Sequence, residues 1–231
     1  IFMNSYTQVL LGKNSNVTHC RLEESGGLPT SGVEQSDADL RNKENERPAM
    51  QNTILETLDV HCAGESAHYG GTVLSLGGNG RVRMCASIAL LRPGSSVDLK
   101  GFSLNGGNCR HDIKTNIQHI ADGCTSAQIQ KNLVSGRATT SFRGRVRVEQ
   151  SAQQTDSNQV SRTVLLTDTS RAWSVPSLEI IADDVKCTHG ATFSDLSEEE
   201  LFYLRSRGIT VREARNLLMY AFFFFLISDV P

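Results

Sequence analysis

The clearest chemical potential in this sequence lies in a thiol and an imidazole two residues apart, Cys187 and His189, within ADDVKCTHGAT. Residues two apart in an extended strand project from the same face, so this pair could serve one site. Thiolate sulfur and imidazole nitrogen can both bind metal ions in proteins, so the pair is a candidate metal site on a strand. Taken alone, the favoured interpretation is a chemically silent cysteine, because free cysteine usually packs as a small apolar side chain.

Nucleophilic catalysis by the same two side chains is a weaker hypothesis. Neighbours on one face of a strand lie ~7 Å apart, too far for the hydrogen bond through which a base activates a thiol. No third group is evident that would orient the imidazole. The sequence also has no G-x-x-x-x-G-K-[ST] phosphate loop. We expect the chain to supply surface and ligands, with nucleotide hydrolysis left to another protein.

The other cysteines and histidines carry no comparable spacing. The six cysteines include no C-x-x-C pair, which argues against a zinc ribbon, a thioredoxin-like motif or a disulfide framework and favours a reducing compartment. A chain of 231 residues can bury a hydrophobic core without disulfides or structural zinc. We expect purely structural roles for the remaining residues of both types: His19, Cys20, His61, Cys62, His68, Cys85, Cys109, His111, His119 and Cys124.

Charge and hydropathy limit the kinds of partner that the protein is expected to bind. The net charge is -2 with 21% charged residues, which gives no field suited to nucleic acid or an anionic membrane. Arg143, Arg145 and Arg147 alternate with apolar residues and could grip phosphates, but a solvated strand face is the favoured interpretation. The apolar run at residues 217–227 is shorter than the ~20 residues that span a bilayer. No membrane segment is predicted.

Most of the chain has the signature of short strands. Apolar and polar residues alternate over residues 81–90 and again over 142–148, which predicts strands with one buried face. Over residues 97–104 the alternation shifts at Gly101, as at a bulge or corner. Further strands are expected at residues 163–167 and 178–182. A sandwich, a barrel and a β-solenoid all fit this all-β pattern.

Two departures from the strand pattern define the domain organisation. Residues 23–51 are rich in Gly, Pro, Ser and charges, which predicts a disordered insertion within a β core at residues 1–195. A helical segment follows at residues 196–231. There Ser197 and Glu200 form a capping box, Gly208 ends the helix, and Thr210 with Glu213 starts a second helix through residues 217–218. Leu201, Phe202 and Leu204 carry the apolar face of the first helix, and residues 222–231 are treated as a separate tail.

The segment ADDVKCTHGAT followed by LFYLRSRG resembles the C-terminal end of the SufB/SufD family, the scaffold proteins of the SUF iron–sulfur cluster assembly system. FRGRVRVEQSAQQTDSNQVSRTVLLTDTSRAWSVPSLEI, SLGGNGRVR and LKGFSLNGG resemble earlier parts of that family, so the likeness covers about residues 60–222. Ser161-Arg162 stands where SufB-type sequences have Cys-Asp, and Gly190 where they have Glu. Ile113-Lys114 replaces a frequent pair of histidines. The SufD side of the family fits better.

The resemblance implies a right-handed parallel β-helix with a C-terminal helical hairpin, in a fragment without the family's N-terminal helical region. It implies a non-catalytic scaffold that pairs with a SufB-like subunit and docks a SufC-like ATPase. A transient iron–sulfur cluster would be held at the subunit interface by His189, with Cys187 beside it. The ATPase would bind the first helix through Leu201, Phe202, Tyr203, Leu204, Arg205 and Arg207.

The insertion at residues 23–51 favours a plastid-bearing eukaryote, and hence the plastid stroma, and the alternative location is a prokaryotic cytoplasm. The alternative function is a structural or ligand-binding β-solenoid without cluster chemistry. Carbohydrate-binding solenoids present rows of aromatic side chains, which this sequence lacks, because Trp173 is its single tryptophan.

Overall fold

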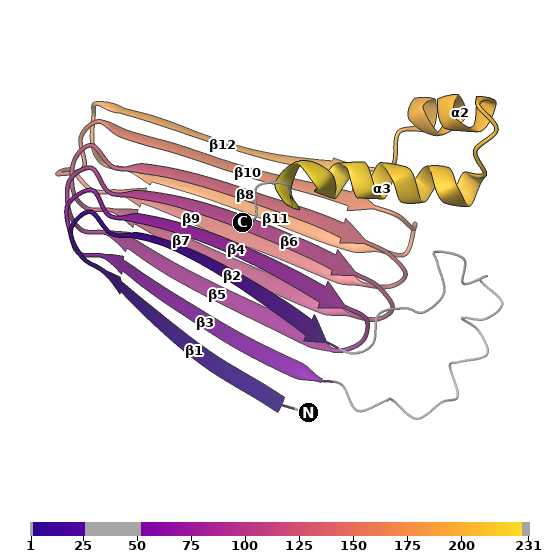
Figure 1. Cartoon of the computed structure of the whole chain (residues 1–231), viewed down its shortest axis with the longest axis horizontal. Helices are drawn as coiled ribbons and strands as arrows, with labels where there is room; N and C mark the ends of the chain where they lie inside the picture. The colour runs from indigo at the N-terminus through magenta and orange to yellow at the C-terminus, as the bar shows by residue number, and fades with distance from the viewer. Residues whose placement is uncertain (1, 26–51, 228–231) are drawn as a thin grey trace.

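The computed structural model of the protein describes residues 2–25 and 52–227. Within them, twelve strands form two six-stranded parallel sheets (Figure 1). The first, sheet A, contains β1 (Phe2–Leu11), β3 (Thr53–Cys62), β5 (Arg81–Leu90), β7 (Arg110–His119), β9 (Thr139–Val148) and β11 (Arg171–Ile180). The second, sheet B, contains β2 (Asn16–Ser25), β4 (His68–Gly77), β6 (Ser96–Asn105), β8 (Thr125–Val134), β10 (Thr155–Leu165) and β12 (Val185–Ser194).

Consecutive strands alternate between the two sheets, so each coil of the chain contributes one strand to each. Thr53 pairs with Arg81, Arg81 with Arg110, and Arg110 with Thr139, which are steps of 28, 29 and 29 residues. All pairings are parallel, and within residues 2–25 and 52–227 each sheet ends in strands that pair on one side only. This arrangement is a parallel β-solenoid, as the family resemblance implies. It excludes the antiparallel sandwich and the closed barrel.

Side-chain alternation explains why these segments form strands. In β5 the inward residues are apolar and buried, and the outward residues are polar or small. The predicted strand at residues 81–90 is confirmed to the residue. Coils β1 to β6 enclose an apolar interior around Val60, Tyr69 and Ile88, whereas the inward faces of β8 and β10 are largely polar.

The predicted bulge or corner at Gly101 is wrong. β6 continues through it in unbroken register with β4 and β8. The apolar pattern shifts there because a helix covers the outer face of sheet B, so Phe102 turns outward and packs edge-to-face on Phe223, with ring centres 5.8 Å apart. Gly101 itself faces inward, where an added Cβ would collide with the amide of Gln130.

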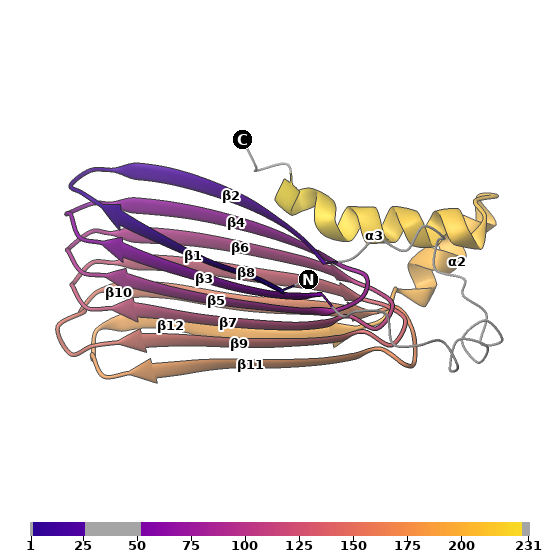
Figure 2. The same cartoon turned by 90° about the horizontal axis from the view of Figure 1, so that it is seen from below.

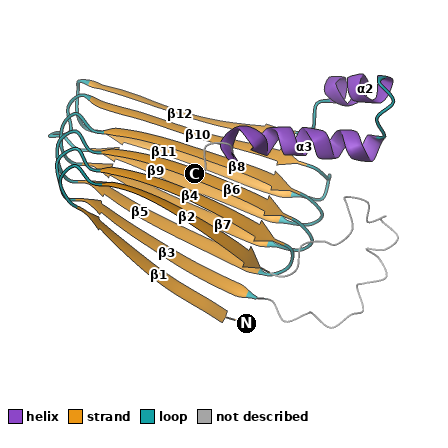
Figure 3. Ribbon diagram, in the orientation of Figure 1, coloured by secondary structure: helices purple, strands orange, loops and turns teal. Residues whose placement is uncertain are grey.

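Two helices follow the last strand, α2 (Glu198–Ser206) and α3 (Val211–Ile227) (Figures 1 and 3). Both predicted starts are confirmed: the amide of Glu200 donates to Ser197 Oγ at 3.3 Å, and that of Glu213 donates to Thr210 Oγ1 at 3.3 Å. Gly208 follows α2 with φ +85°, a conformation suited to glycine. No helix of the described residues is long and apolar enough to cross a lipid bilayer.

The packing of the helices corrects two expectations. Phe202, predicted on the apolar face of α2, is 72% exposed, while Leu201 and Leu204 pack inward. Residues 222–227, treated as a tail, continue α3, and Phe222 and Phe223 pack against the cluster of Leu133, Val164 and Leu201. Viewed from the second direction, the C-terminal part of α3 lies on the outer side of sheet B (Figure 2).

The predicted insertion lies mostly outside the described residues, which omit 26–51. Its first residues, 23–25, belong to β2. The side chain of Glu23 is buried and accepts a hydrogen bond from Ser75 Oγ at 2.7 Å. The β core ends at Ser194 and the first helix begins at Glu198, near the predicted division at residues 195–196.

Candidate functional site

Cys187 and His189 lie on β12, which is the last strand of sheet B and pairs on one side only. Cα partners place Cys187 beside Ser157 and His189 beside Gln159 on β10. Ser157 and Gln159 are buried inward residues, so the thiol and the imidazole belong to the same inward face. They lie at the rim of the solenoid, since no further strand of the described chain covers them. Figure 1 shows β12 at one end of the stack.

The two side chains differ in burial. Cys187 is half-buried and packs against the apolar interior, while His189 is exposed. Burial, followed by the negative charge of Asp156, raises the pKa of the Cys187 thiol. At neutral pH the thiol therefore keeps its proton until a cation or a partner displaces it. The imidazole makes no hydrogen bond or ion pair with any of the described residues.

A polar ladder extends inward from each of the two residues. Below Cys187, the hydroxyls of Ser157 and Ser126 are 2.8 Å apart, and Ser126 Oγ lies 2.9 Å from His119 Nε2. Below His189, Gln159 Nε2 donates to Gln128 Oε1 at 2.7 Å, and Gln128 Nε2 donates to Thr115 Oγ1 at 2.9 Å. The rim pair is therefore backed by buried hydrogen-bonding groups.

The rim also exposes apolar side chains. Some belong to the inward face of the last coil, which has no following coil to cover it, and others to the outer face of β11. Exposed apolar groups gathered at a free strand edge mark an interaction surface. The exposed residues, which we call the rim set, are Trp173, Val175, Ile180, Ile181 and Phe193.

Among the described residues, no three His, Cys, Asp or Glu side chains are grouped as they would be around a bound metal ion. Cys187 and His189 thus form an incomplete ligand set, because iron–sulfur clusters are usually held by four protein ligands. The chemistry of the donors fits iron and sulfide, but this chain offers two donors at an edge, where another surface can contribute the rest.

Half of the ten residues expected to be structural are interior. Cys62, Cys109, His111, His119 and Cys124 are at most 1% exposed. Burial lowers the pKa of both His111 and His119 to about 4, which keeps these rings neutral at physiological pH. The rest are exposed or half-buried, and three of them form hydrogen bonds: His19 with Tyr69, His61 with Asp59, and His68 with Ser96.

The residues predicted to bind a partner divide between two surfaces of α2. Leu201 and Leu204 pack into the protein, so they hold the helix in place. Phe202 and Tyr203 are exposed, as are the two arginines, and the Arg207 guanidinium lies 5.2 Å from the centre of the Tyr203 ring. α2 therefore presents aromatic and basic groups to solvent, which are enriched in protein interfaces.

Residues 1–222 match the family model described as "SUF system FeS cluster assembly, SufBD core domain". The chain therefore belongs to the SufB/SufD family. It is 33% identical to the iron–sulfur cluster assembly protein SufD of Escherichia coli over 74% of this chain and 38% of that protein. It is 34% identical to protein ABCI7, chloroplastic, of Arabidopsis thaliana over 86% of this chain and 42% of that protein.

A protein of Synechocystis named as an iron–sulfur cluster assembly SufBD family protein is 27% identical over the whole chain and 45% of its own length. The chain thus spans less than half the length of these curated relatives. The SufD-named relatives support a SufD-like member, in agreement with the resemblance.

Sequence reasoning found the pair on β12 but missed the polar ladders behind it. Ser157, Gln159, Ser126 and Gln128 resemble surface residues when only apolar periodicity is considered. The signal lies in the register: once the strands are paired at their spacing of 28 to 32 residues, these polar positions align beneath Cys187 and His189.

Proposed function

We propose that this chain is a non-catalytic scaffold subunit of a SUF-type complex, and that it contributes His189, with Cys187 beside it, to a transient iron–sulfur assembly site. The observation that carries the proposal is the placement of an exposed imidazole and a half-buried thiol on the free edge strand of a SufD-like solenoid. The cluster is assembled for transfer to other proteins, so a site at a subunit interface that can open would allow its release.

A SufB-like subunit would supply the missing ligands. Two donors cannot complete the coordination of a cluster, and a partner that adds its own strand edge at β11 and β12 would bring its side chains next to His189. The rim set supports this pairing because it would become buried by such a partner. Binding of the partner at this edge would therefore also complete the set of cluster ligands.

A SufC-like ATPase would dock on the exposed side of α2 through Phe202, Tyr203, Arg205 and Arg207. Leu201 and Leu204 would act indirectly by fixing the helix on the solenoid. The absence of a phosphate loop in the printed sequence is consistent with nucleotide hydrolysis by that other subunit.

The raised pKa of Cys187 argues against a catalytic nucleophile. A catalytic thiol needs a depressed pKa and a base in hydrogen-bond contact, whereas burial shifts this thiol in the opposite direction. The chloroplastic name of the Arabidopsis thaliana relative supports a plastid location, which localisation of a fluorescent fusion would test.

The test is anaerobic cluster reconstitution on the complex of the full-length protein with SufB- and SufC-like subunits, followed by absorbance spectroscopy. We expect His189→Ala to impair cluster formation by more than the ~10-fold typical of losing a hydrogen-bond partner of a metal ligand, while co-purification of both partners is unchanged. His61→Ala, on β3 four coils away, is the matched control and should behave as wild type. Normal assembly by His189→Ala would refute the site.

A further inference from the structure

The polar ladder behind His189 ends in an acceptor that has no donor. Gln159 is fully buried, and its Oε1 makes no hydrogen bond. A buried acceptor left unpaired costs about 1–3 kcal/mol, so such groups nearly always have a partner. Its Cα partners are Gln128 on β8, whose amide oxygen already accepts from Gln159 Nε2, and His189 on β12, whose ring carries an N–H donor.

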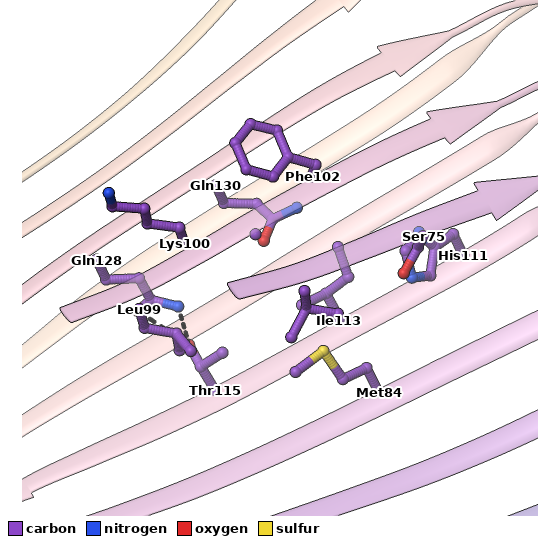
Figure 4. A pocket seen from close by; sticks show the side chains of 12 residues that line it. Ser75, Met84, Leu99, Lys100, Phe102, His111, Ile113, Thr115, Gln128 and Gln130 are labelled. Carbon is purple, nitrogen blue, oxygen red and sulfur yellow. Dashed lines mark hydrogen bonds between the residues drawn. The ribbon is translucent and has the colours of Figure 1, made fainter. Parts of the chain in front are cut away.

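The Gln159 amide is held by the residues behind it. Across the interior between sheets A and B, Thr115 Oγ1 donates to Gln128 Oε1 at 3.1 Å and accepts from Gln128 Nε2 at 2.9 Å (Figure 4). Gln128 Oε1 then accepts from Gln159 Nε2 at 2.7 Å. A flipped Gln159 would bring two carbonyl oxygens together, so its Oε1 is the atom that remains for the β12 side.

The opposite sheet is shaped around this amide. Gly144 on β9 faces Gln159 across the interior, and an added Cβ there would lie 2.3 Å from Gln159 Nε2 and 2.7 Å from Phe142 Cζ. Only glycine leaves room for the side chain in this position. The glutamine therefore occupies a fitted slot and not a loosely filled space.

We propose that Gln159 is a positioning residue for His189: its Oε1 accepts a hydrogen bond from one ring N–H, which leaves the lone pair of the other ring nitrogen free for iron. Adjacent strands lie ~4.8 Å apart, within reach of an imidazole turned toward β10. The exposed ring has no competing protein partner among the described residues. Outer hydrogen bonds of this kind fix the tautomer and orientation of histidine ligands. The inference rests on the proposed function for its use of iron, but not for the hydrogen bond itself.

The test is nitrogen NMR of the full-length protein labelled with ¹⁵N-histidine, at a pH where imidazole is neutral. The His189 signals are identified by their loss in His189→Ala. We expect two well-separated ring-nitrogen shifts, the signature of a single tautomer. In Gln159→Met, which keeps the length of the side chain but removes the acceptor, the two shifts should move toward each other as tautomers mix.

Two further variants separate positioning from folding. Gln159→Glu, protonated in this buried setting, can donate to Gln128 and accept from His189, so it should restore the wild-type signature. Ser161→Ala removes a buried hydroxyl two residues along the same strand and should change nothing at His189. Mixed tautomers in the wild type, or an unchanged signature in Gln159→Met, would overturn the inference.

Cluster reconstitution on the same variants distinguishes this inference from the proposed function. Gln159→Met should slow assembly about 10-fold. If the signature changes in Gln159→Met but His189→Ala assembles clusters normally, positioning stands and the assembly site fails. If His189→Ala is impaired and the Gln159→Met signature is unchanged, the assembly site stands and positioning fails.

Discussion

Lys131, on β8 in sheet B, donates a hydrogen bond from Nζ to the backbone carbonyl of Phe222 at 2.6 Å, and the same ammonium lies 4.8 Å from the centre of the Phe222 ring. The lysine is 8% exposed, and burial lowers its pKa. One buried cation thus joins the middle of the solenoid to the last helix. It explains why the run of phenylalanines belongs to α3 and not to a loose tail.

Replacing this lysine should release the end of α3. In Lys131→Met the carbonyl of Phe222 loses its donor and the ring its cation, which we expect to cost about 1–3 kcal/mol. Hydrogen exchange of the α3 amides should accelerate while the strands of sheet A stay protected. Lys114→Met removes an exposed lysine from the outer face of sheet A and should leave α3 exchange unchanged. Equal protection of α3 in both variants would contradict this role.

Filling the space opposite Gln159 should destabilise the solenoid. The Cβ in Gly144→Ala would meet the Gln159 amide and the Phe142 ring, so the variant should lose roughly 1–3 kcal/mol of unfolding free energy, the usual cost of overpacking. Gly190→Ala is the control, because nothing lies within 4 Å of the added atom on β12. Urea unfolding of both variants measures the difference. A Gly144→Ala protein as stable as Gly190→Ala would show that the slot is not tight.

The sequence predicts the elements whose two faces differ in hydropathy. β5 is placed correctly because its apolar residues face an apolar interior, and the caps at Ser197 and Thr210 depend only on local hydrogen bonds. β10 was placed at residues 163–167, although it begins at Thr155, because its inward residues are polar and hide the alternation.

The local residue pattern does not distinguish a solenoid from other all-β folds, and it does not reveal the polar ladders behind Cys187 and His189. The coil period is carried by register and not by repeated residue types, so it is visible only once strands are paired. Local pattern fails at Phe102 for the same reason. Its outward position depends on contact with α3, which lies more than 100 residues further along the chain.

Two buried histidines should make the fold sensitive to acid. Burial lowers the pKa of His111 and His119 to about 4, below the usual ~6.5 of the unfolded chain. The unfolded state therefore binds more protons between these values, so stability is complete above pH 6.5 and falls as pH drops toward 4. The slope should approach ~1.4 kcal/mol per pH unit for each histidine. His119→Gln should halve the slope in urea unfolding, and an unaltered slope in the double glutamine variant would contradict the assignment.

A buried acidic pair should produce the opposite dependence at higher pH. Glu23 and Glu56 lie within the first coils with one arginine, Arg21, for two carboxyl groups. Burial, followed by Glu56, raises the pKa of Glu23 to about 8, above the ~4.3 of an unfolded glutamate. The folded state then holds the extra proton, so stability falls as pH rises from about 4.5 to 8.

Glu23→Gln keeps the shape of the protonated acid and should remove that loss. We expect the variant to exceed the wild type by roughly 1–3 kcal/mol at pH 8 and to match it near pH 5. The exposed neighbour supplies the control, because Glu24→Gln should follow the wild-type profile at both pH values. Thermal or urea unfolding measured at pH 5 and pH 8 is sufficient. A Glu23→Gln protein that loses stability at pH 8 would show that the carboxylate is charged and well paired.

A single substitution on β11 or on α2 should weaken the binding of one proposed partner without affecting the other. Trp173 is 53% exposed on the edge strand β11, and Phe202 is 72% exposed on α2. Since neither is part of the core, alanine at either position should change stability by less than about 0.5 kcal/mol. Buried aromatic anchors typically contribute more than 2 kcal/mol to an interface. Trp173→Ala should therefore weaken binding of the SufB-like subunit at least ~30-fold and leave binding of the SufC-like ATPase unchanged, while Phe202→Ala should do the reverse.

Each variant is the control for the other in calorimetric titrations. Loss of binding to both partners in either variant would place the two interfaces on one surface.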